Sequence, residues 1–385
     1  MPNVMATTTI HGSDDPALAE QAARQAARLL GEGRLVVFPT ETVYGIAASA
    51  ASDTALAALR RFKHRPNEQP FSIHLPDAAS VERYIGPVEA PLRRFIAKLL
   101  PGPVTLVVDV DDQTIRQCLA ALNLPADAAG RLYHDNTVGL RCPDHPVAQQ
   151  VLGATDDPIV ASSANRRGQR PPHDAEQAAR AVGDAADLII DGGRCRYAKA
   201  STIVRVRREG PEPKISVERR GVLDERYIRK LLRWTVLFVC SGNTCRSPMA
   251  ELLARSILAK QRGVAIDKLD AASVAVMSAG VLASAGMRAS EPAIEAMKKR
   301  GLDLSHHRSQ PLTLELIHQA DVICCMTEDH CRAVVDMAPA AADKTVRLDP
   351  DGDVEDPIGS DSAAYERCAE QIRRGLEHRF REWQP

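Results

Sequence analysis

One stretch decides the fold of the C-terminal half of the chain: Thr235-Val236-Leu237-Phe238-Val239-Cys240-Ser241-Gly242-Asn243-Thr244-Cys245-Arg246. Its apolar run at 235–239 predicts a short buried strand that delivers Cys240 to a tight loop. The amphipathic stretch at 247–254 predicts a helix after the loop, with Pro248 in the first turn, where proline is favoured. A strand, a tight loop and a helix in this order indicate an α/β fold.

The loop itself has the composition of an anion site that contains a nucleophile. Its backbone N–H groups and the helix N-terminus converge where a phosphate dianion would sit, and the same field favours the thiolate of Cys240. Arg246 adds a planar fork that can grip two oxygens, and Gly242 and Asn243 tolerate the positive φ angles of such a loop. A lone cysteine is often only a small core residue. The Cys-x5-Arg-Ser spacing predicts function instead, because the arginine has no packing reason to point into the loop.

Bulk properties restrict the class of protein. With 385 residues the chain is too long for one ordinary core and indicates two or three domains. A formal net charge of −1 gives no overall field that would recruit nucleic acid or a membrane surface. The sequence has no apolar stretch of transmembrane length, and residues 1–3 lack the basic-then-apolar form of a signal peptide. We therefore expect a soluble, cytoplasmic protein without membrane contacts.

The nine cysteines are an odd number without a compact framework, so they predict reduced thiols. Cys324 and Cys325 lie in an apolar run that predicts a buried strand, and we interpret both as structural. Cys142 and His145 suggest half of a metal site, but no second ligand pair has matching spacing. We expect no metal bound directly by the protein.

The order of predicted elements divides the chain after Gly221. Residues 209–213 look like a break, but the alternating run at 214–217 follows directly, so they predict a turn between two strands. A short charged helix at 223–234 then leads to the second domain, where strands and helices alternate as in a doubly wound parallel sheet. The expected domains are 10–223, of mixed α/β type, and 234–385. In the first domain we expect a helix at 16–30 and strands at 35–38, 71–75, 104–108, 137–140, 159–161, 188–190 and 202–206.

From about residue 236 to 383 the chain resembles the low-molecular-weight protein-tyrosine phosphatase family. Besides the Cys240 loop, the resemblance rests on segments 278–280, 301–308, 312–313 and 356–359. It implies that the Cys240 thiolate attacks phosphorus in line to form a phosphocysteine, while Arg246 and the loop amides hold the oxygens. Asp356 would protonate the leaving group and then activate water. The supporting loop residues would be Ser241, Gly242, Asn243, Thr244, Cys245 and Ser247, with Asn243 keeping the loop in shape and Ser247 donating to the thiolate.

The residue at position 244 bears on the substrate of this domain. Members that act on phosphotyrosine usually carry a bulky aliphatic residue there, whereas members that resemble protein-arginine phosphatases carry threonine, as this chain does. The resemblance thus favours phosphoarginine in a phosphoprotein, with phosphotyrosine close behind and arsenate reduction as a third option. Cys245 either forms a reversible disulfide with Cys240 on oxidation or is a packed thiol.

Over about residues 10 to 223 the chain resembles the YrdC-type threonylcarbamoyl-AMP synthase family. The motifs are segments 39–45, 63–66, 101–106 and 162–165, in that order. The resemblance implies that L-threonine, bicarbonate and ATP, accompanied by Mg2+, give threonylcarbamoyl-AMP and pyrophosphate. This reaction is the first step toward threonylcarbamoyladenosine in tRNA, so tRNA-modification proteins are implied partners.

The residues suit this chemistry. Lys63 and Arg65, two apart on an extended segment, would both face the phosphates of ATP, and Arg141 would pair with the threonine carboxylate. Three departures weaken the expected late nucleotide contacts: Ala200 stands where glutamate or proline is usual, Arg205 where aspartate is common, and Arg220 where proline is usual. The full set implied for ATP and threonine is Thr40, Thr42, Lys63, Arg65, His74, Thr137, Arg141, Ser163, Asn165, Ser201 and Arg219.

Two readings compete with a bifunctional enzyme. In the first, the N-terminal domain binds tRNA, or double-stranded RNA in general, through the basic concavity of YrdC-like folds and makes no adenylate. In the second, that domain senses ATP or threonine, and the phosphatase alone is active.

Overall fold

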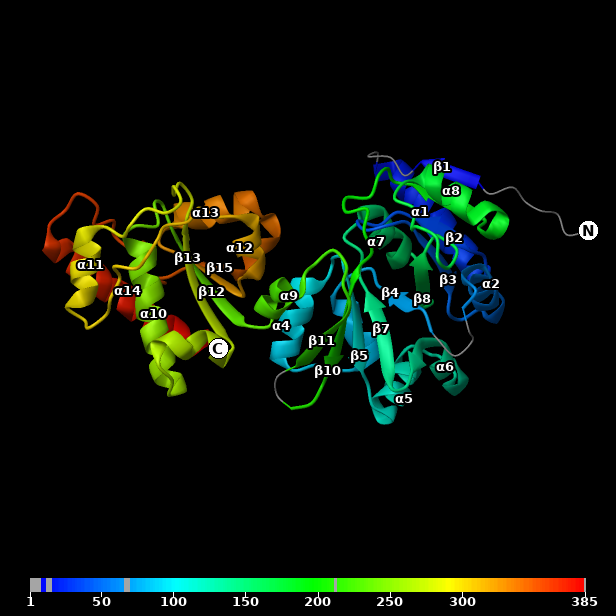
Figure 1. Cartoon of the computed structure of the whole chain (residues 1–385), viewed down its shortest axis with the longest axis horizontal. Helices are drawn as coiled ribbons and strands as arrows, with labels where there is room; N and C mark the ends of the chain where they lie inside the picture. Colours follow the sequence, from blue (N-terminus) through cyan, green and yellow to red (C-terminus); the bar gives the residue numbers. More distant parts are fainter. Residues whose placement is uncertain (1–7, 12–15, 66–69, 211–212, 384–385) are drawn as a thin grey trace, which may run out of the picture. The chain divides into compact units, whose positions relative to one another are not determined.

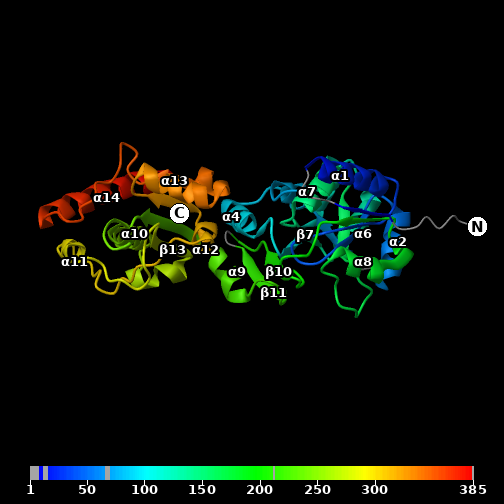
Figure 2. The same ribbon diagram turned by 90° about the horizontal axis from the view of Figure 1, so that it is seen from above.

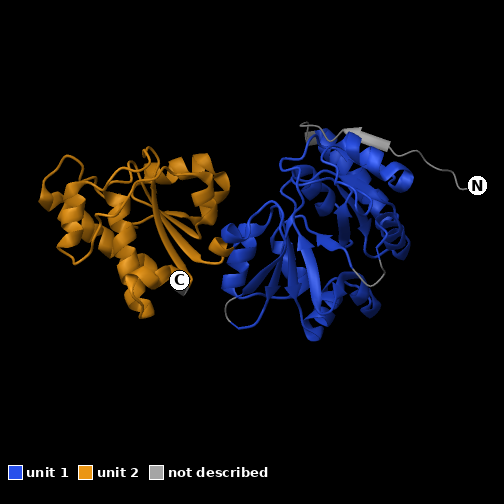
Figure 3. Cartoon of the chain, viewed as in Figure 1, with its two compact units in different colours: residues 1–228 blue, residues 229–385 orange. Residues whose placement is uncertain are grey.

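The structure is a computed structural model that describes residues 8–11, 16–65, 70–210 and 213–383. Pro66 of the basic motif and residues 211–212 of the expected turn lie outside these ranges. The chain forms two compact units, residues 1–228 and 229–385 (Figure 3). In place of the expected helix at 223–234, α9 (Glu225–Leu231) lies where the units meet in sequence.

Unit 1 is built on a mixed sheet, in which 11 strands are described (Figure 1). Neighbours are antiparallel from β2 through β3 and β8 to β4, while β4 and β7, and β5 and β10, are parallel. β10 and β11 pair antiparallel, as the expected turn between them requires. In pairing order the strands are β1 (Thr8–His11), β9 (Leu188–Asp191), β2 (Val36–Phe38), β3 (Gly45–Ser49), β8 (Ile159–Ser163), β4 (Ser72–His74), β7 (Thr137–Arg141), β5 (Val104–Asp109), β10 (Thr202–Arg207) and β11 (Lys214–Arg219), with β6 (Tyr133–His134) beside β7.

Helix α2 (Asp53–Lys63) shows how local sequence positions the site of unit 1. Ser52 caps it by accepting a hydrogen bond from the Ala55 N–H, and a buried apolar face packs it onto the unit. His64, with φ of 47°, ends it in the left-handed conformation and redirects the chain. The other α-helices of this unit are α1 (Pro16–Gly31), α3 (Glu82–Ile85), α4 (Ala90–Leu99), α5 (Asp112–Ala121), α6 (Ala129–Leu132), α7 (Pro146–Gly153) and α8 (Ala175–Val182).

Unit 2 is the expected doubly wound fold, with a parallel sheet in the order β13 (Val274–Gly280), β12 (Trp234–Cys240), β14 (Val322–Cys325) and β15 (Thr345–Arg347). Alternate residues of β12 face opposite layers, because side chains of a strand alternate between its faces. Val236 and Phe238 pack with α10 (Arg246–Arg262), α11 (Glu291–Lys298) and α14 (Ser362–Trp383), whereas Leu237 and Val239 pack with α12 (Leu314–Gln319) and α13 (Glu328–Met337). Figure 1 and Figure 2 show α10 and α11 on one side of this sheet and α12 on the other. Cys240 thus stands at the carboxyl end of a central strand, where ligands bind in open α/β sheets. Within the described ranges, every helix is too short or too polar to cross a membrane.

Candidate active sites

In unit 2, the Cys240 thiol points into the loop between β12 and α10. Its Sγ lies 2.9 Å from the Ser247 hydroxyl oxygen and accepts a hydrogen bond of 3.3 Å from the Asn243 backbone N–H. Both partners are placed to stabilise negative charge on sulfur, because hydrogen bonds to the charged form favour it. The loop and α10 follow the thiol directly, so the predicted order of strand, loop and helix is confirmed, and the sulfur lies within the loop.

Asn243 fixes the shape of this loop. Its φ is 53°, and its side-chain amide donates to the Ser247 and Ser278 hydroxyls, each at 2.9 Å. Its side-chain oxygen accepts the Gln310 N–H at 2.8 Å, and its backbone carbonyl accepts the His307 Nε2–H at 2.8 Å. Sequence reasoning gave Asn243 this role but assigned none to Gln310 or His307, which come from a segment far along the chain.

The loop arginine and the expected acid form an ion pair. Arg246, whose side chain is 5% exposed, donates through Nη2 to Asp356 at 2.5 Å and to the Ser241 hydroxyl at 3.4 Å. Its Nη1 donates to the Val354 carbonyl at 3.2 Å. The Asp356 side chain is 43% exposed, so the carboxylate borders solvent while the guanidinium beneath it is buried.

The two loop residues before Arg246 lie side by side, with the Thr244 hydroxyl oxygen 3.7 Å from the Cys245 sulfur. The Cys245 thiol, which is 6% exposed, lies 3.1 Å from the Ser290 hydroxyl and 3.7 Å from that of Tyr365. Thr244 is half-buried, and its backbone carbonyl accepts the Ser290 N–H at 2.9 Å. The thiol of Cys245 therefore has hydroxyl partners of its own beside α11 and α14, as a packed thiol would.

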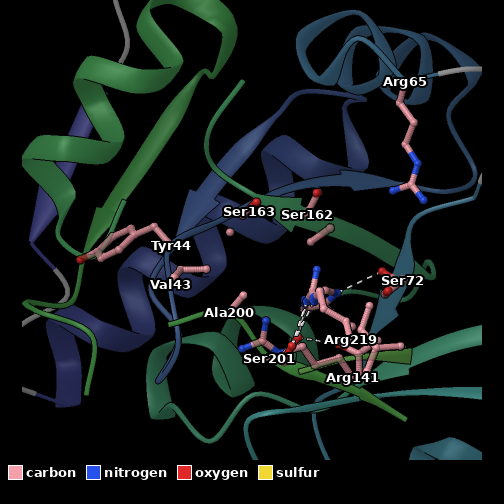
Figure 4. A pocket seen from close by; sticks show the side chains of 15 residues that line it. Val43, Tyr44, Arg65, Ser72, Arg141, Ser162, Ser163, Ala200, Ser201 and Arg219 are labelled. Carbon is pink, nitrogen blue, oxygen red and sulfur yellow. Dashed lines mark hydrogen bonds between the residues drawn. The ribbon is translucent and has the colours of Figure 1, made fainter. Parts of the chain in front are cut away.

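In unit 1, a cavity gathers six of the eleven residues expected to bind ATP and threonine: Arg65, His74, Arg141, Ser163, Ser201 and Arg219 (Figure 4). Arg65 enters it from one side, while Ser201, Arg219 and Arg141 cluster on the other. The rest of the lining was not predicted to bind a ligand, although Val43, Tyr44, Gly45, Thr105 and Ser162 belong to the family motifs and Ala200 was noted as a departure. The other lining residues are Ser72, Ala161 and Ile203.

Thr40 and Thr42 lie behind the cavity lining and orient Arg141. The Arg141 Nη2 donates to Thr40 Oγ1 at 3.1 Å, to Thr42 Oγ1, and to the Glu41 carboxylate at 3.1 Å. Glu41 is 2% exposed and also accepts the Asp144 backbone N–H at 3.0 Å. These contacts fix the guanidinium at the cavity wall with part of its charge neutralised.

The other two guanidinium groups of the cavity leave it positively charged. Arg219 donates to the Ser201 carbonyl at 2.9 Å and to its hydroxyl at 3.1 Å, and burial beside Arg141 lowers the pKa of Arg219. Burial near Arg60 also lowers the pKa of Arg65. Within the described ranges, neither Arg65 nor Arg219 has a carboxylate partner. Arg65 is half-buried and Arg219 is exposed, and their uncompensated positive charge would attract an anion to the cavity.

Lys63 differs from its expected placement on an extended segment shared with Arg65. It is the last residue of α2, and the left-handed conformation of His64 turns the chain between Lys63 and Arg65, so their side chains do not share one face of an extended segment. The Lys63 ammonium donates to the carbonyls of Ser163 at 2.8 Å and Asn165 at 2.5 Å, and it does not line the cavity. Burial, and to a lesser degree Arg65, lowers the pKa of Lys63 to about 8.

Thr137 and His74 lie at different distances from the cavity. Thr137 begins β7, four residues before Arg141, and at about 3.3 Å per residue it lies too far along the strand to line the cavity. Its hydroxyl donates to the His134 carbonyl at 2.7 Å. His74 does line the cavity, and burial beside Arg141 lowers its pKa to about 3, so its ring is neutral.

Comparison with known proteins assigns each unit to a family. The family described as "Telomere recombination", which groups Sua5, YciO and YrdC, matches residues 28–221. The family described as "Low molecular weight phosphotyrosine protein phosphatase" matches residues 235–384. The chain belongs to both families. Threonylcarbamoyl-AMP synthase from Bacillus subtilis (strain 168) is 32% identical to the Sua5/YrdC unit over 192 residues, which are 50% of this chain and 51% of that relative. The chain thus spans about half the length of this curated relative.

Two relatives of the phosphatase unit carry different names. The probable low-molecular-weight protein-tyrosine-phosphatase EpsP of Ralstonia nicotianae is 36% identical over 145 residues, 37% of this chain and 91% of its own length. The protein-arginine-phosphatase of Bacillus subtilis (strain 168) is 37% identical over 142 residues, 36% of this chain and 88% of its own length. Their near-equal identity leaves the choice of substrate to the residues of the site.

Proposed function

We propose that the chain is a bifunctional enzyme. Its Sua5/YrdC unit forms threonylcarbamoyl-AMP from L-threonine, bicarbonate and ATP for tRNA threonylcarbamoyladenosine modification. Its phosphatase unit hydrolyses a phosphoprotein through a phosphocysteine. The observation that carries the second activity is the Cys240 Sγ, held by the Ser247 hydroxyl and the Asn243 N–H in a loop that ends at the buried Arg246. Because ATP, tRNA and phosphoproteins are cytoplasmic, we place both reactions in the cytoplasm.

The phosphatase reaction follows from the contacts of Cys240, Arg246 and Asp356. A phosphate group entering the loop competes with Asp356 for the Arg246 guanidinium, which then grips two phosphate oxygens. Asp356, displaced from the guanidinium, takes up a proton from solvent. The thiolate then attacks phosphorus, the sulfur–phosphorus bond forms, and the bond to the leaving group breaks as Asp356 passes that proton to it. Asp356, now a carboxylate, takes a proton from water, which attacks the phosphocysteine and releases inorganic phosphate and the thiolate.

Thr244 supports phosphoarginine as the leaving-group class. It is half-buried in the loop, and a hydroxyl there accepts a guanidinium N–H, which a branched aliphatic side chain cannot do. Its smaller bulk also leaves room for the planar guanidinium. Phosphotyrosine is the second candidate, and arsenate, a tetrahedral oxyanion like phosphate, is the third.

The test compares turnover of phosphoarginine and phosphotyrosine peptides by the full chain. We expect a higher kcat/KM for phosphoarginine, and a shift toward phosphotyrosine in Thr244→Ile. The Cys240→Ser variant is the matched control and should turn over neither. Equal turnover by wild type and Cys240→Ser would rule out the proposed nucleophile, and unchanged preference in Thr244→Ile would rule out the role of the threonine.

For the Sua5/YrdC unit, the positive cavity supports a site for ATP and the threonine carboxylate. Arg65 and Arg219 provide positive charge for the phosphates, and the Arg141 guanidinium, held in place by its hydrogen bonds, can bind a carboxylate. The Lys63 ammonium holds the segment that carries Ser163 against α2. Within the described ranges, no three His, Cys, Asp or Glu side chains gather as a metal site, although Mg2+ that accompanies ATP needs only one or two protein ligands. We assign no step to that ion, which would arrive on the triphosphate.

The test for this unit is pyrophosphate release by the full chain. We expect release only when threonine, bicarbonate and ATP are all present, and loss of release in Lys63→Ala with phosphatase turnover intact. RNA binding without such release would support the RNA-binding alternative. Binding of ATP or threonine without release, together with phosphatase turnover that responds to either ligand, would support the sensor alternative. Stimulation of release by tRNA-modification proteins would identify the implied partners.

A further inference from the structure

His330 joins helix α13 to the catalytic loop of the phosphatase unit. Thr327 caps α13 and accepts the His330 backbone N–H at 3.3 Å, and its hydroxyl also lies 2.8 Å from the ring Nδ1. The other ring nitrogen, Nε2, lies 2.9 Å from the hydroxyl of Ser241. The residue is 5% exposed. Both ring nitrogens are therefore occupied, one by the residue that caps the helix and one by the catalytic loop.

Ser241 connects this ring to the group that grips phosphate. It directly follows Cys240, and its hydroxyl oxygen accepts the Arg246 Nη2–H at 3.4 Å. The hydroxyl thus lies between a guanidinium that changes partners during the reaction and an imidazole fixed on a helix. Without the ring, the hydroxyl would be free to rotate and the guanidinium would lose a fixed neighbour.

The charge on the ring fits this arrangement. Burial and the nearby Arg246 lower the pKa of His330, whereas the carboxylates of Asp329, Asp353 and Asp356 act in the opposite direction. The net effect is a neutral ring at neutral pH. A neutral ring bonds both hydroxyls with one donor and one acceptor nitrogen, and adds no second cation to compete for phosphate.

We propose that His330 is a positioning residue, which through the Ser241 hydroxyl holds the Arg246 guanidinium in the orientation that grips phosphate oxygens. This inference rests on the proposed phosphatase function of the unit. A histidine that served packing alone would find its partners within the core. Here one partner belongs to the loop that carries the nucleophile, on a different element of the fold.

The test is a double-mutant cycle in the full chain, with hydrolysis of 4-nitrophenyl phosphate as the readout. We expect His330→Leu and Ser241→Ala each to lower kcat/KM about tenfold, the effect of losing one hydrogen bond to a charged group. Because both substitutions break one connection, the double variant should also lose about tenfold and not about a hundredfold. His330→Gln, whose amide reaches the Ser241 hydroxyl, should retain activity within about threefold. His378→Leu on α14 is the control for loss of a histidine elsewhere.

The outcomes distinguish a failure of the proposed phosphatase function from a failure of the positioning role of His330. Absence of turnover in the wild-type chain would overturn the phosphatase function and this inference with it. Turnover in the wild type, with additive losses in the double variant or no rescue by His330→Gln, would overturn the positioning role alone. If His330→Leu fails to fold, the comparison of Ser241→Ala with His330→Gln still decides: equal losses in both contradict the proposal.

Discussion

Replacing Gly280 by alanine should inactivate the phosphatase unit without touching its catalytic side chains. Gly280 ends β13 and pairs with Cys240 across the sheet. An added Cβ would lie 2.5 Å from the Ser241 carbonyl oxygen and 2.8 Å from the Asn243 backbone nitrogen. An ordinary contact begins at 3.4 Å, so the Ser241 carbonyl must move by about 0.9 Å. The Leu282 N–H holds that carbonyl at 2.9 Å, so the shift also breaks a backbone hydrogen bond.

The size of the effect follows from where the displaced atoms act. The Asn243 N–H that must move is the one that donates to the Cys240 sulfur. A misplacement of about 1 Å at reacting groups costs about a hundredfold in rate, and overpacking of this kind costs about 1–3 kcal/mol of stability. We therefore expect kcat/KM of Gly280→Ala to fall about a hundredfold.

The assay is hydrolysis of 4-nitrophenyl phosphate by the full chain, with pyrophosphate release by the other unit as an internal measure of folded protein. Gly352→Ala is the matched control, because an added Cβ there meets nothing within 4 Å and its φ is not in the left-handed region. Gly280→Ala with more than half of the wild-type kcat/KM, and an unchanged thermal transition, would refute the steric reasoning.

Three further predictions concern both sites. Lys63 loses its charge as the pH rises through its lowered pKa of about 8, so kcat/KM for ATP in the wild type should fall above that pH. In Lys63→Arg the guanidinium stays charged, so kcat/KM should not fall there. Parallel pH profiles of the two proteins would contradict a role for the Lys63 charge. Asp356→Asn should lower kcat for phosphoarginine peptides about 10²–10⁴-fold and for 4-nitrophenyl phosphate less, since nitrophenolate leaves without a proton; equal losses would argue against an acid role. Gly221→Ala would place its Cβ 2.3 Å from the Ser201 carbonyl carbon, so adenylate formation should fall while phosphatase turnover persists. Gly130→Ala is the control, because an added Cβ there meets nothing within 4 Å. Normal pyrophosphate release by Gly221→Ala would contradict the close packing of Gly221 against Ser201.

Local sequence predicted the phosphatase loop well because its parts are contiguous. Strand β12, the loop and α10 follow one another, so a continuous apolar run and an amphipathic stretch were enough to place Cys240 and Arg246. The doubly wound sheet followed from the alternation of elements. His330 and Gln310 could not be placed in this way, since their contacts with the loop join residues more than sixty positions apart.

The Sua5/YrdC site was harder to place because its residues come from many elements. Lys63 and Arg65 were expected to share an extended segment, yet α2 continues through Lys63. Strand β3 was not predicted, because Gly45–Ser49 holds small residues with weak strand propensity and is fixed by its neighbours β2 and β8. Thr137 shares a strand with Arg141, but a shared strand does not imply a shared site.

The most direct test of the account is to trap the intermediate on Cys240. The full chain would be mixed with a phosphoarginine protein, quenched in acid within one turnover, and its peptides examined by mass spectrometry. We predict the added mass of one phosphoryl group on the peptide that carries Cys240. In the Cys240→Ser variant, we predict no phosphorylated cysteine. Steady turnover of the substrate with an unmodified Cys240 peptide at every quench time would contradict the account.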